Sequence, residues 1–164
     1  MIDNNYSSFL TFVNNKFKFN TYLLFKLPSA WLCGVRVNEI DTEKAIVTIP
    51  FKWLSQNPFR SIYFACLAMA AELSTGILAM GYTYRSEPAI SMLVVNMQAK
   101  FIKKAVEKVY FTCSAGQDFY KAAEAAKATG EPVLFTAKSI GQTKSGEIVA
   151  EFEITWSFKA KTKR

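Results

Sequence analysis

The sequence predicts an α+β domain in which an antiparallel sheet of about six strands curls around one long central helix. The segment 62–80 is apolar on almost every side and holds one charged residue, so a helix there must be buried nearly all round. Six segments of alternating apolar and polar residues are joined mostly by short connections, which favour antiparallel neighbours. A sheet wrapped around the helix buries both, and the length of 164 residues suits one domain over 1–164.

Residues 6–27 are predicted to be helical, because apolar side chains recur there at helical spacing. The pairs Asn14-Asn15 and Asn20-Thr21 weaken the pattern and favour two shorter helices. Pro28 should end the segment, since proline removes a backbone donor. We therefore expect 1–28 to form an N-terminal helical segment.

The first two strands are expected next. Residues 35–38 alternate apolar and polar side chains, 41–43 (Asp-Thr-Glu) indicates a tight turn, and 47–53 alternates again. Pro50 suggests an edge position or a bulge in the second strand, because proline cannot donate to the hydrogen-bond ladder.

The central helix should begin shortly after these strands. Asn57 before Pro58 is typical of an N-cap followed by proline at the first helical position, and Ser61 is a second candidate cap. The helix is predicted to run to Met80 and to stop at Gly81, since glycine is common just beyond a helix.

The second half of the chain is predicted to be mainly strand. The expected elements are strands at 93–101 and 109–115, a short helix at 119–126 stopped by Gly130, a strand at 133–137, a loop at 141–146 and a strand at 148–159. The apolar residues of the first of these strands are placed on one face, namely Leu93, Val95, Met97, Ala99 and Phe101.

Histidine is absent from the chain, and its absence excludes several mechanisms. Ser-His-Asp and Cys-His nucleophiles, histidine-ligated zinc and imidazole acid–base chemistry are all ruled out. Catalysis must use carboxylates, hydroxyls, lysine, backbone dipoles or the substrate itself. Cys33, Cys66 and Cys113 show no Cys-x-x-Cys spacing, and we interpret them as reduced, buried thiols rather than metal ligands or disulfides.

The net charge of +7 arises partly from a basic tail at 159–164. No basic stripe interleaved with aromatic residues stands out, so nucleic-acid binding is not expected. Asp3 stands where a signal peptide would carry positive charge. Glu72 and the interruption at 74–76 (Ser-Thr-Gly) argue against a membrane span at 62–80. A cytoplasmic protein without a membrane span is therefore expected.

Glu72 is the only carboxylate between Lys44 and Ser86, and it lies in the most apolar part of the chain. Burial of an isolated charge is costly, so desolvation should raise the pKa of this carboxyl group. Such a carboxylate can act as a general base or nucleophile. It can equally bind a backbone amide or a cation across a subunit interface, and the pattern favours neither role.

The start of the central helix is a second candidate for chemistry. Free amides and the positive end of the helix dipole can hold a carbonyl oxygen or an anion. Asn57 and Ser61 can contribute side-chain groups to a ligand or act as ordinary caps. Tyr63 can donate a hydrogen bond to a ligand or pack as a core aromatic residue.

These residues carry a resemblance to a known family. The segment from Asn57 to Glu72 is similar to the active-site segment of the phenylacetate-pathway-type acyl-CoA thioesterases, which have the hotdog fold. In that family an asparagine precedes His-Gly-Gly by six residues, and an acidic residue follows seven after the second glycine. Here Tyr63, Phe64 and Ala65 stand at the His-Gly-Gly positions, and Glu72 stands at the acidic position.

A second match lies in NMQAKFIKKA, from Asn96 to Ala105, which resembles the third strand of the family. The opening Asn-Pro-Phe-x-Ser places the chain nearest to an uncharacterised thioesterase-like branch of hotdog proteins. The resemblance implies that the lysine cluster Lys100, Lys103 and Lys104 meets the phosphates of coenzyme A.

The resemblance implies hydrolysis of an acyl-CoA thioester, with Glu72 as base or nucleophile, Asn57 orienting substrate or water, and the amides at 63–65 as the oxyanion site. Coenzyme A enters as part of the substrate, and no further cofactor or metal is implied. The fold implies a homodimer, or a dimer of dimers, whose sites take groups from both copies. Because His-Gly-Gly is missing, a non-catalytic acyl-binding or acyl-CoA-binding protein is the alternative. A hydratase-like enzyme is disfavoured, since that chemistry needs a His paired with an Asp.

Overall fold

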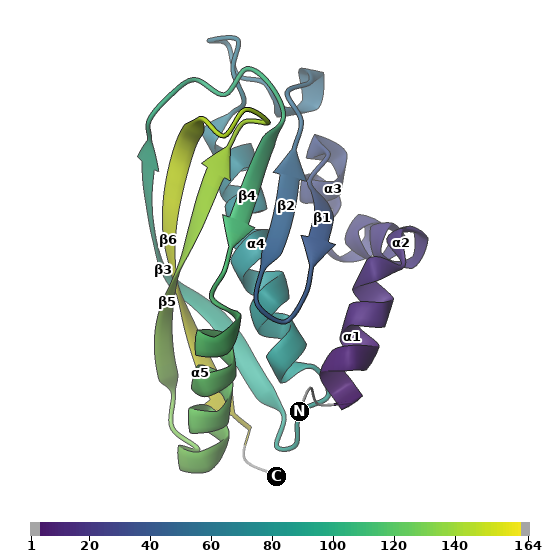
Figure 1. Cartoon of the computed structure of the whole chain (residues 1–164), viewed down its shortest axis with the longest axis vertical. Helices are drawn as coiled ribbons and strands as arrows, with labels where there is room; N and C mark the ends of the chain where they lie inside the picture. The colour runs from purple at the N-terminus through teal and green to yellow at the C-terminus, as the bar shows by residue number, and fades with distance from the viewer. Residues whose placement is uncertain (1–3, 162–164) are drawn as a thin grey trace.

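A six-stranded antiparallel sheet curls around the long helix α4, as the sequence predicts (Figure 1). The computed structural model describes residues 4–161. The strands are β1 (Arg36–Ile40), β2 (Ala45–Ile49), β3 (Ile90–Phe101), β4 (Val109–Cys113), β5 (Val133–Gln142) and β6 (Ile148–Ala160), in the spatial order β1-β2-β4-β5-β6-β3. The helices are α1 (Asn4–Asn14), α2 (Lys16–Lys26), α3 (Pro28–Cys33), the 3-10 turn η1 (Trp53–Ser55), α4 (Phe64–Thr83) and α5 (Gly116–Thr129).

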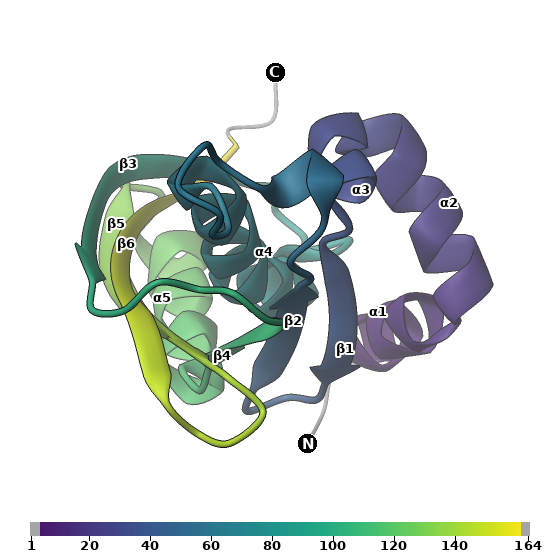
Figure 2. The same cartoon turned by 90° about the horizontal axis from the view of Figure 1, so that it is seen from above.

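Helix α4 lies in the concave side of the sheet, which surrounds it when the molecule is seen from above (Figure 2). The hydroxyls of Ser74 and Ser139, both buried, lie 2.7 Å apart and join the helix to β5. The indole of Trp156 on β6 donates to the Thr75 hydroxyl over 3.0 Å. Gly76 makes this packing feasible, because a Cβ there would lie 3.0 Å from the Trp156 ring.

The predicted ends of the central helix are wrong by several residues. The helix begins at Phe64 with Tyr63 as its N-cap, so neither Asn57 nor Ser61 caps it. Gly81 lies inside the helix, which continues to Thr83, because that glycine packs against Tyr6 of α1. Among the described residues α4 is the one helix long and apolar enough to cross a membrane, and 67% of its apolar window is buried inside the fold, as in a core helix.

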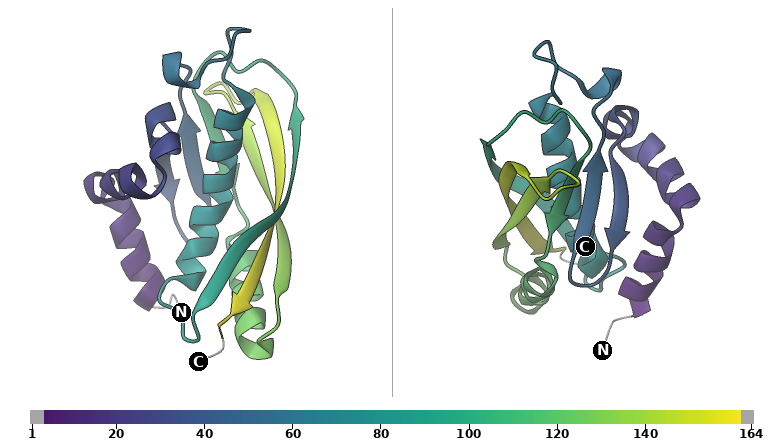
Figure 3. Two further views of the ribbon diagram at one scale, coloured as in Figure 1. Left: turned by 180° about the vertical axis from the view of Figure 1, so that it is seen from behind. Right: turned by 45° about the horizontal axis from the view of Figure 1, so that its top comes forward.

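The N-terminal segment consists of three helices packed along the β1 side of the molecule (Figure 3). The side chain of Asn15 caps α2 by accepting from the Lys18 amide over 3.1 Å, which explains the break at the predicted asparagine pair. Pro28 does not end the helical segment. It opens α3, where its missing donor has no cost at the first helical position.

The second strand ends earlier than predicted. Pro50 follows Ile49, the last residue of β2, and η1 replaces the rest of the expected strand. The strand is interior to the sheet, between β1 and β4, so the predicted edge position is wrong. Pro50 is tolerated because it comes after the last ladder hydrogen bond rather than within the ladder.

Strand β3 forms one edge of the sheet and carries a bulge that the sequence pattern hid. The register against β6 shifts between Val94 and Asn96. As a result, even-numbered residues face inward before the bulge, and odd-numbered residues face inward after it. Met97 pairs with Ile154 and faces inward as predicted, whereas Leu93 pairs with Ser157 and faces outward. The placement of all five apolar residues on one face is therefore wrong for Leu93.

The remaining elements agree with prediction in type and order, with longer bounds for β5 and α5. Gly130 ends α5 in the left-handed region, at φ 72°, as expected for a glycine cap. Lys159 lies within β6 rather than in a tail, and Lys163 and Arg164 are outside the described residues. All three cysteines are free thiols, but Cys33 is only half-buried, and its sulfur lies 3.6 Å from that of Cys66.

Candidate functional site

A pocket of about 510 Å³ opens at the N-terminal end of α4. It is bounded by the loop before the helix, the first helical turns and the segment that follows β3. Its lining residues are Asn57, Pro58, Phe59, Ser61, Ile62, Tyr63, Phe64, Leu67, Phe101, Ile102, Lys103, Lys104 and Ala105. Six residues predicted from the sequence thus meet in one pocket: Asn57, Ser61, Tyr63, Phe64, Lys103 and Lys104.

The loop before α4 is held together by Asn57. Its side-chain oxygen accepts from the amides of Phe59 and Ser61 over 3.0 and 3.2 Å. Its side-chain nitrogen lies 3.1 Å from the Ser61 hydroxyl. The hydrogen-bonding groups of Asn57 are therefore used within its own loop, and its position shapes the pocket wall.

The first turn of α4 presents two unsatisfied amides beside this pocket. In the part of the chain that the structure describes, the N–H groups of Phe64 and Ala65 make no hydrogen bond, and Tyr63 provides no side-chain cap. The amide of Tyr63 itself donates to the Ser55 carbonyl over 2.8 Å. The positive end of the helix dipole and the free amide of Phe64 therefore lie at the pocket, with the free amide of Ala65 next in the helix, and such a helix start suits a carbonyl oxygen or an anion.

Aromatic rings form the rim of the pocket. Phe64 is 56% exposed, and its ring makes edge contacts with Tyr63 at 4.8 Å and with Phe101 at 6.2 Å between centroids. Phe101 in turn packs on the buried Phe152 of β6. The entrance is therefore apolar.

Glu72 lies further along α4, on the same side of the helix as Ala65. Eight residues separate it from Phe64, or about 12 Å along the helix axis. Burial raises the pKa of the Glu72 carboxyl group. One carboxylate oxygen lies beside Gly76, at 3.3 Å from where a Cβ would stand. The carboxyl group is thus desolvated but remote from the pocket of its own chain.

The lysine cluster is divided between two faces of the molecule. Lys103 and Lys104 line the pocket, and Lys103 forms an ion pair with Glu147. Lys100 pairs in register with Glu151 on the outer face of the sheet, in a separate groove of about 330 Å³. Asn96, across from Thr155, also faces outward, so neither of these two predicted residues reaches the pocket within one chain.

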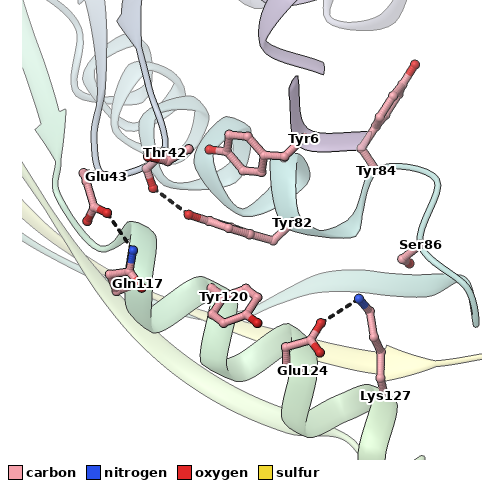
Figure 4. Close-up of a pocket in the computed structure, with 11 residues that line it drawn as sticks. Tyr6, Thr42, Glu43, Tyr82, Tyr84, Ser86, Gln117, Tyr120, Glu124 and Lys127 are labelled. Carbon is pink, nitrogen blue, oxygen red and sulfur yellow. Dashed lines mark hydrogen bonds and ion pairs between the residues drawn. The ribbon is translucent and has the colours of Figure 1, made fainter. Parts of the chain in front are cut away.

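A larger cavity, of about 590 Å³, lies at the opposite end of α4 and contains none of the predicted site residues (Figure 4). Four tyrosines from α1, the end of α4 and α5 line it, namely Tyr6, Tyr82, Tyr84 and Tyr120. Tyr82 donates to the Thr42 carbonyl over 2.6 Å. Burial, together with the nearby Glu43, raises the pKa of Tyr82 to about 12. The polar groups that line the cavity largely bind one another, as Glu124 and Lys127 do at 2.7 Å.

Sequence reasoning missed several pocket residues because they come from elsewhere in the chain. Ile62 donates its amide to the Ala105 carbonyl over 2.8 Å and so fixes the segment after β3 against the loop before α4. Phe101 and Ile102 reach the pocket through this contact. The available signal was the resemblance of NMQAKFIKKA to the third strand of the family, since that segment spans Phe101, Ile102 and Ala105. The cavity lined by tyrosines had no signal in the sequence, because its four tyrosines come from segments that are far apart in the chain.

No group of three or more His, Cys, Asp or Glu residues within 4–161 is arranged to hold a metal ion.

The sheet order, the wrapped central helix and the pocket at its N-terminus define a hotdog-fold protein. Solved structures share this fold at low sequence identity. PA5026 of Pseudomonas aeruginosa, a protein of unknown function described as a "probable thioesterase", superimposes with a TM-score of 0.75 at 16% identity, over 88% of this chain and 96% of its own. OLEI01261 of Chlorobaculum tepidum, of unknown function, superimposes with a TM-score of 0.76 at 14% identity, over 94% of this chain and 99% of its own. The thioesterase HI1161 of Haemophilus influenzae superimposes with a TM-score of 0.64 at 12% identity, over 89% of this chain and 91% of its own.

The family itself is identified from the sequence. Residues 16–158 match the family described as "Domain of unknown function (DUF4442)", and the chain belongs to that family. None of the curated proteins matches it.

Proposed function

We propose that this protein hydrolyses an acyl-CoA thioester. The observation that carries the proposal is the pair of free amides, of Phe64 and Ala65, at the start of a buried helix whose first residue, Phe64, lines an apolar pocket. Such donors can polarise a thioester carbonyl and stabilise the oxyanion that develops on it. The thioesterase described from Haemophilus influenzae supports the proposal through its shared fold.

In this mechanism Glu72 takes a proton from water while the water oxygen bonds to the thioester carbon. The carbon–sulfur bond then breaks, and the coenzyme A thiolate leaves and is protonated. Desolvation raises the pKa of Glu72, which makes the ionised carboxylate a stronger base than an exposed one. Lys103 and Lys104 at the pocket rim are suited to the coenzyme A phosphates.

A second copy of the chain is needed to complete this site. Along the axis of α4, Glu72 lies about 10–12 Å from the residues that carry the free amides. A water that attacks a carbonyl must be about 3 Å from both the base and the carbonyl carbon. The helix start of one copy facing Glu72 of its partner would satisfy the requirement. We therefore propose a homodimer, which can associate further into a dimer of dimers.

Strand β3 supports this homodimer. Its outer edge is unpaired in the sheet, and residues 89–99 carry no charge. Charged residues and proline normally protect such an edge, so its absence of charge favours pairing with another strand. Leu93 and Val95 are 65% and 47% exposed on this strand. The free thiols favour a reducing compartment, and we place the protein in the cytoplasm.

The deciding experiment is hydrolysis of an acyl-CoA panel of different chain lengths by the wild type and by Glu72→Gln. We expect activity on at least one substrate and a loss of about 100-fold or more in the variant, the size of a general-base contribution. Glu131→Gln, an exposed carboxylate in the loop between α5 and β5, is the matched control and should keep full activity. If no acyl-CoA in the panel is hydrolysed in a way that depends on Glu72, the proposal of hydrolysis is refuted.

The alternative function is binding of an acyl or acyl-CoA ligand without chemistry. The Phe64 side chain favours it, because a side chain at this position crowds the close approach to backbone amides that a glycine would allow. Native mass spectrometry and thermal shift with acyl-CoA measure binding apart from turnover. A bound species without hydrolysis would support this alternative, and the absence of both would exclude the two functions together.

A further inference from the structure

Helix α2 exposes its apolar side chains to solvent. Phe17 and Phe25 are 83% and 76% exposed, and Leu24 lies between them on the same side of the helix. Their spacing of seven and eight residues places them in one stripe, opposite the buried Phe19 and Leu23. Large side chains this exposed and aligned are costly in water and indicate an interaction surface.

The same segment is basic and free of opposing charge. Residues 4–38 hold Lys16, Lys18, Lys26 and Arg36 and not one Asp or Glu. All three lysines are exposed, and they lie on both flanks and at the end of the apolar stripe. An apolar stripe flanked by cations and lacking carboxylates is typical of a helix that lies in a membrane interface.

Further exposed apolar side chains lie on α3, which packs against α2, and on η1, which packs against α3. Leu32 on α3 is 50% exposed, and next to it η1 exposes Trp53 and Leu54. The Cys33 thiol donates to the Leu54 carbonyl over 3.3 Å, which fixes η1 against α3. Residues 45–71 also lack any carboxylate. Tryptophan and phenylalanine beside lysine are the residues favoured at the headgroup level of a bilayer.

We propose that this surface, formed by Phe17, Leu24, Phe25, Leu32 and Trp53 with Lys18 and Lys26, binds the surface of a bilayer that contains anionic lipids. The charge of the surface favours an anionic bilayer over a second copy of the chain as the binding partner. A two-fold contact of the surface with itself would bring like-charged lysines together without a carboxylate to neutralise them, whereas anionic headgroups supply the opposite charge. The pocket is close by, because the Tyr63 amide donates to the Ser55 carbonyl at the end of η1.

The test is flotation of the full chain with vesicles of phosphatidylcholine alone or with 30% phosphatidylglycerol. We expect binding to the anionic vesicles that weakens with salt, and little binding to phosphatidylcholine alone. Phe17→Ser with Phe25→Ser should weaken binding about tenfold or more, since each ring then leaves the apolar layer. Lys18→Gln with Lys26→Gln should weaken it about fivefold per lysine, on anionic vesicles only.

Matched controls distinguish membrane binding by this surface from nonspecific adsorption of the protein to vesicles. Leu134→Ser removes a side chain that is 62% exposed on β5, and Lys144→Gln with Lys159→Gln removes two exposed lysines elsewhere. These variants should bind as the wild type does, and circular dichroism checks that every variant folds. Wild-type protein that fails to float, or controls that lose as much binding, would overturn the proposal. Loss of an oligomer on Phe17→Ser with Phe25→Ser would assign the surface to contacts between copies and would also overturn it.

Discussion

At the scale of single residues, Glu72 combines two properties that ordinary surface carboxylates lack. It lies in a helix whose other side chains near it are small or apolar, and burial raises its pKa. Among the described residues it forms no ion pair, so its charge is not compensated within the chain. A carboxylate held in this state reduces stability when it is ionised.

The raised pKa of Glu72 should make the stability of the protein depend on pH. Between the ordinary pKa of glutamate and the raised value, the folded protein holds a proton that the unfolded chain has released. The free energy of unfolding therefore falls as pH rises through this window. Glu72→Gln should raise Tm at pH 7–8, with a gain that disappears near pH 4. Calorimetry across this range is the measurement, and an equal gain at every pH would show that charge is not the cause.

At the scale of elements, α4 is positioned by contacts of its glycines rather than by capping. Gly81 sits against the ring of Tyr6 in α1, so closely that an added Cβ would lie 2.4 Å from a ring carbon. Tyr6 is buried and donates to the Asp41 carbonyl over 3.0 Å, so its ring cannot move away freely. This contact joins the N-terminal helices to the end of the central helix.

Gly81→Ala should therefore destabilise the fold, despite the better helix propensity of alanine. Overpacking costs about 1–3 kcal/mol, which lowers Tm by about 2–4 °C per kcal/mol. Thermal unfolding measures the change. In a Tyr6→Ala background the same substitution should be neutral or stabilising, since the ring is gone. Destabilisation of equal size in both backgrounds would locate the strain elsewhere.

At the scale of the whole molecule, the curled sheet has two edges that differ in protection. The β1 edge lies beside the N-terminal helices, where the Lys16 ammonium approaches the Asn38 carbonyl at 3.4 Å. The β3 edge has no such cover among the described residues. A lone apolar edge strand of twelve residues is a template for pairing, and the proposed dimer would occupy it.

Lysines on this edge should separate the two copies. Leu93→Lys with Val95→Lys is expected to convert a dimer into a monomer, because the charges would be buried against an apolar strand. Native mass spectrometry and sedimentation velocity give the mass. Leu134→Lys, on the outer face of an interior strand, should leave the dimer intact. If the wild type sediments as a monomer, the site cannot be completed as proposed, and the acyl-CoA assay will then be negative for the same reason.

Side-chain pattern alone determined the class of fold, the order of elements and the presence of a central apolar helix, because helical and strand periodicity are local properties. It also identified Glu72 and the loop containing Asn57. Only the tertiary structure decided where α4 begins, since Asn57 can bond its own loop as readily as cap a helix. The bulge at β3 likewise depends on the pairing with β6, and it turned Leu93 outward. The distance from Glu72 to the free amides is a property of the folded helix, and it is the physical reason why the proposed catalytic site needs two copies of the chain.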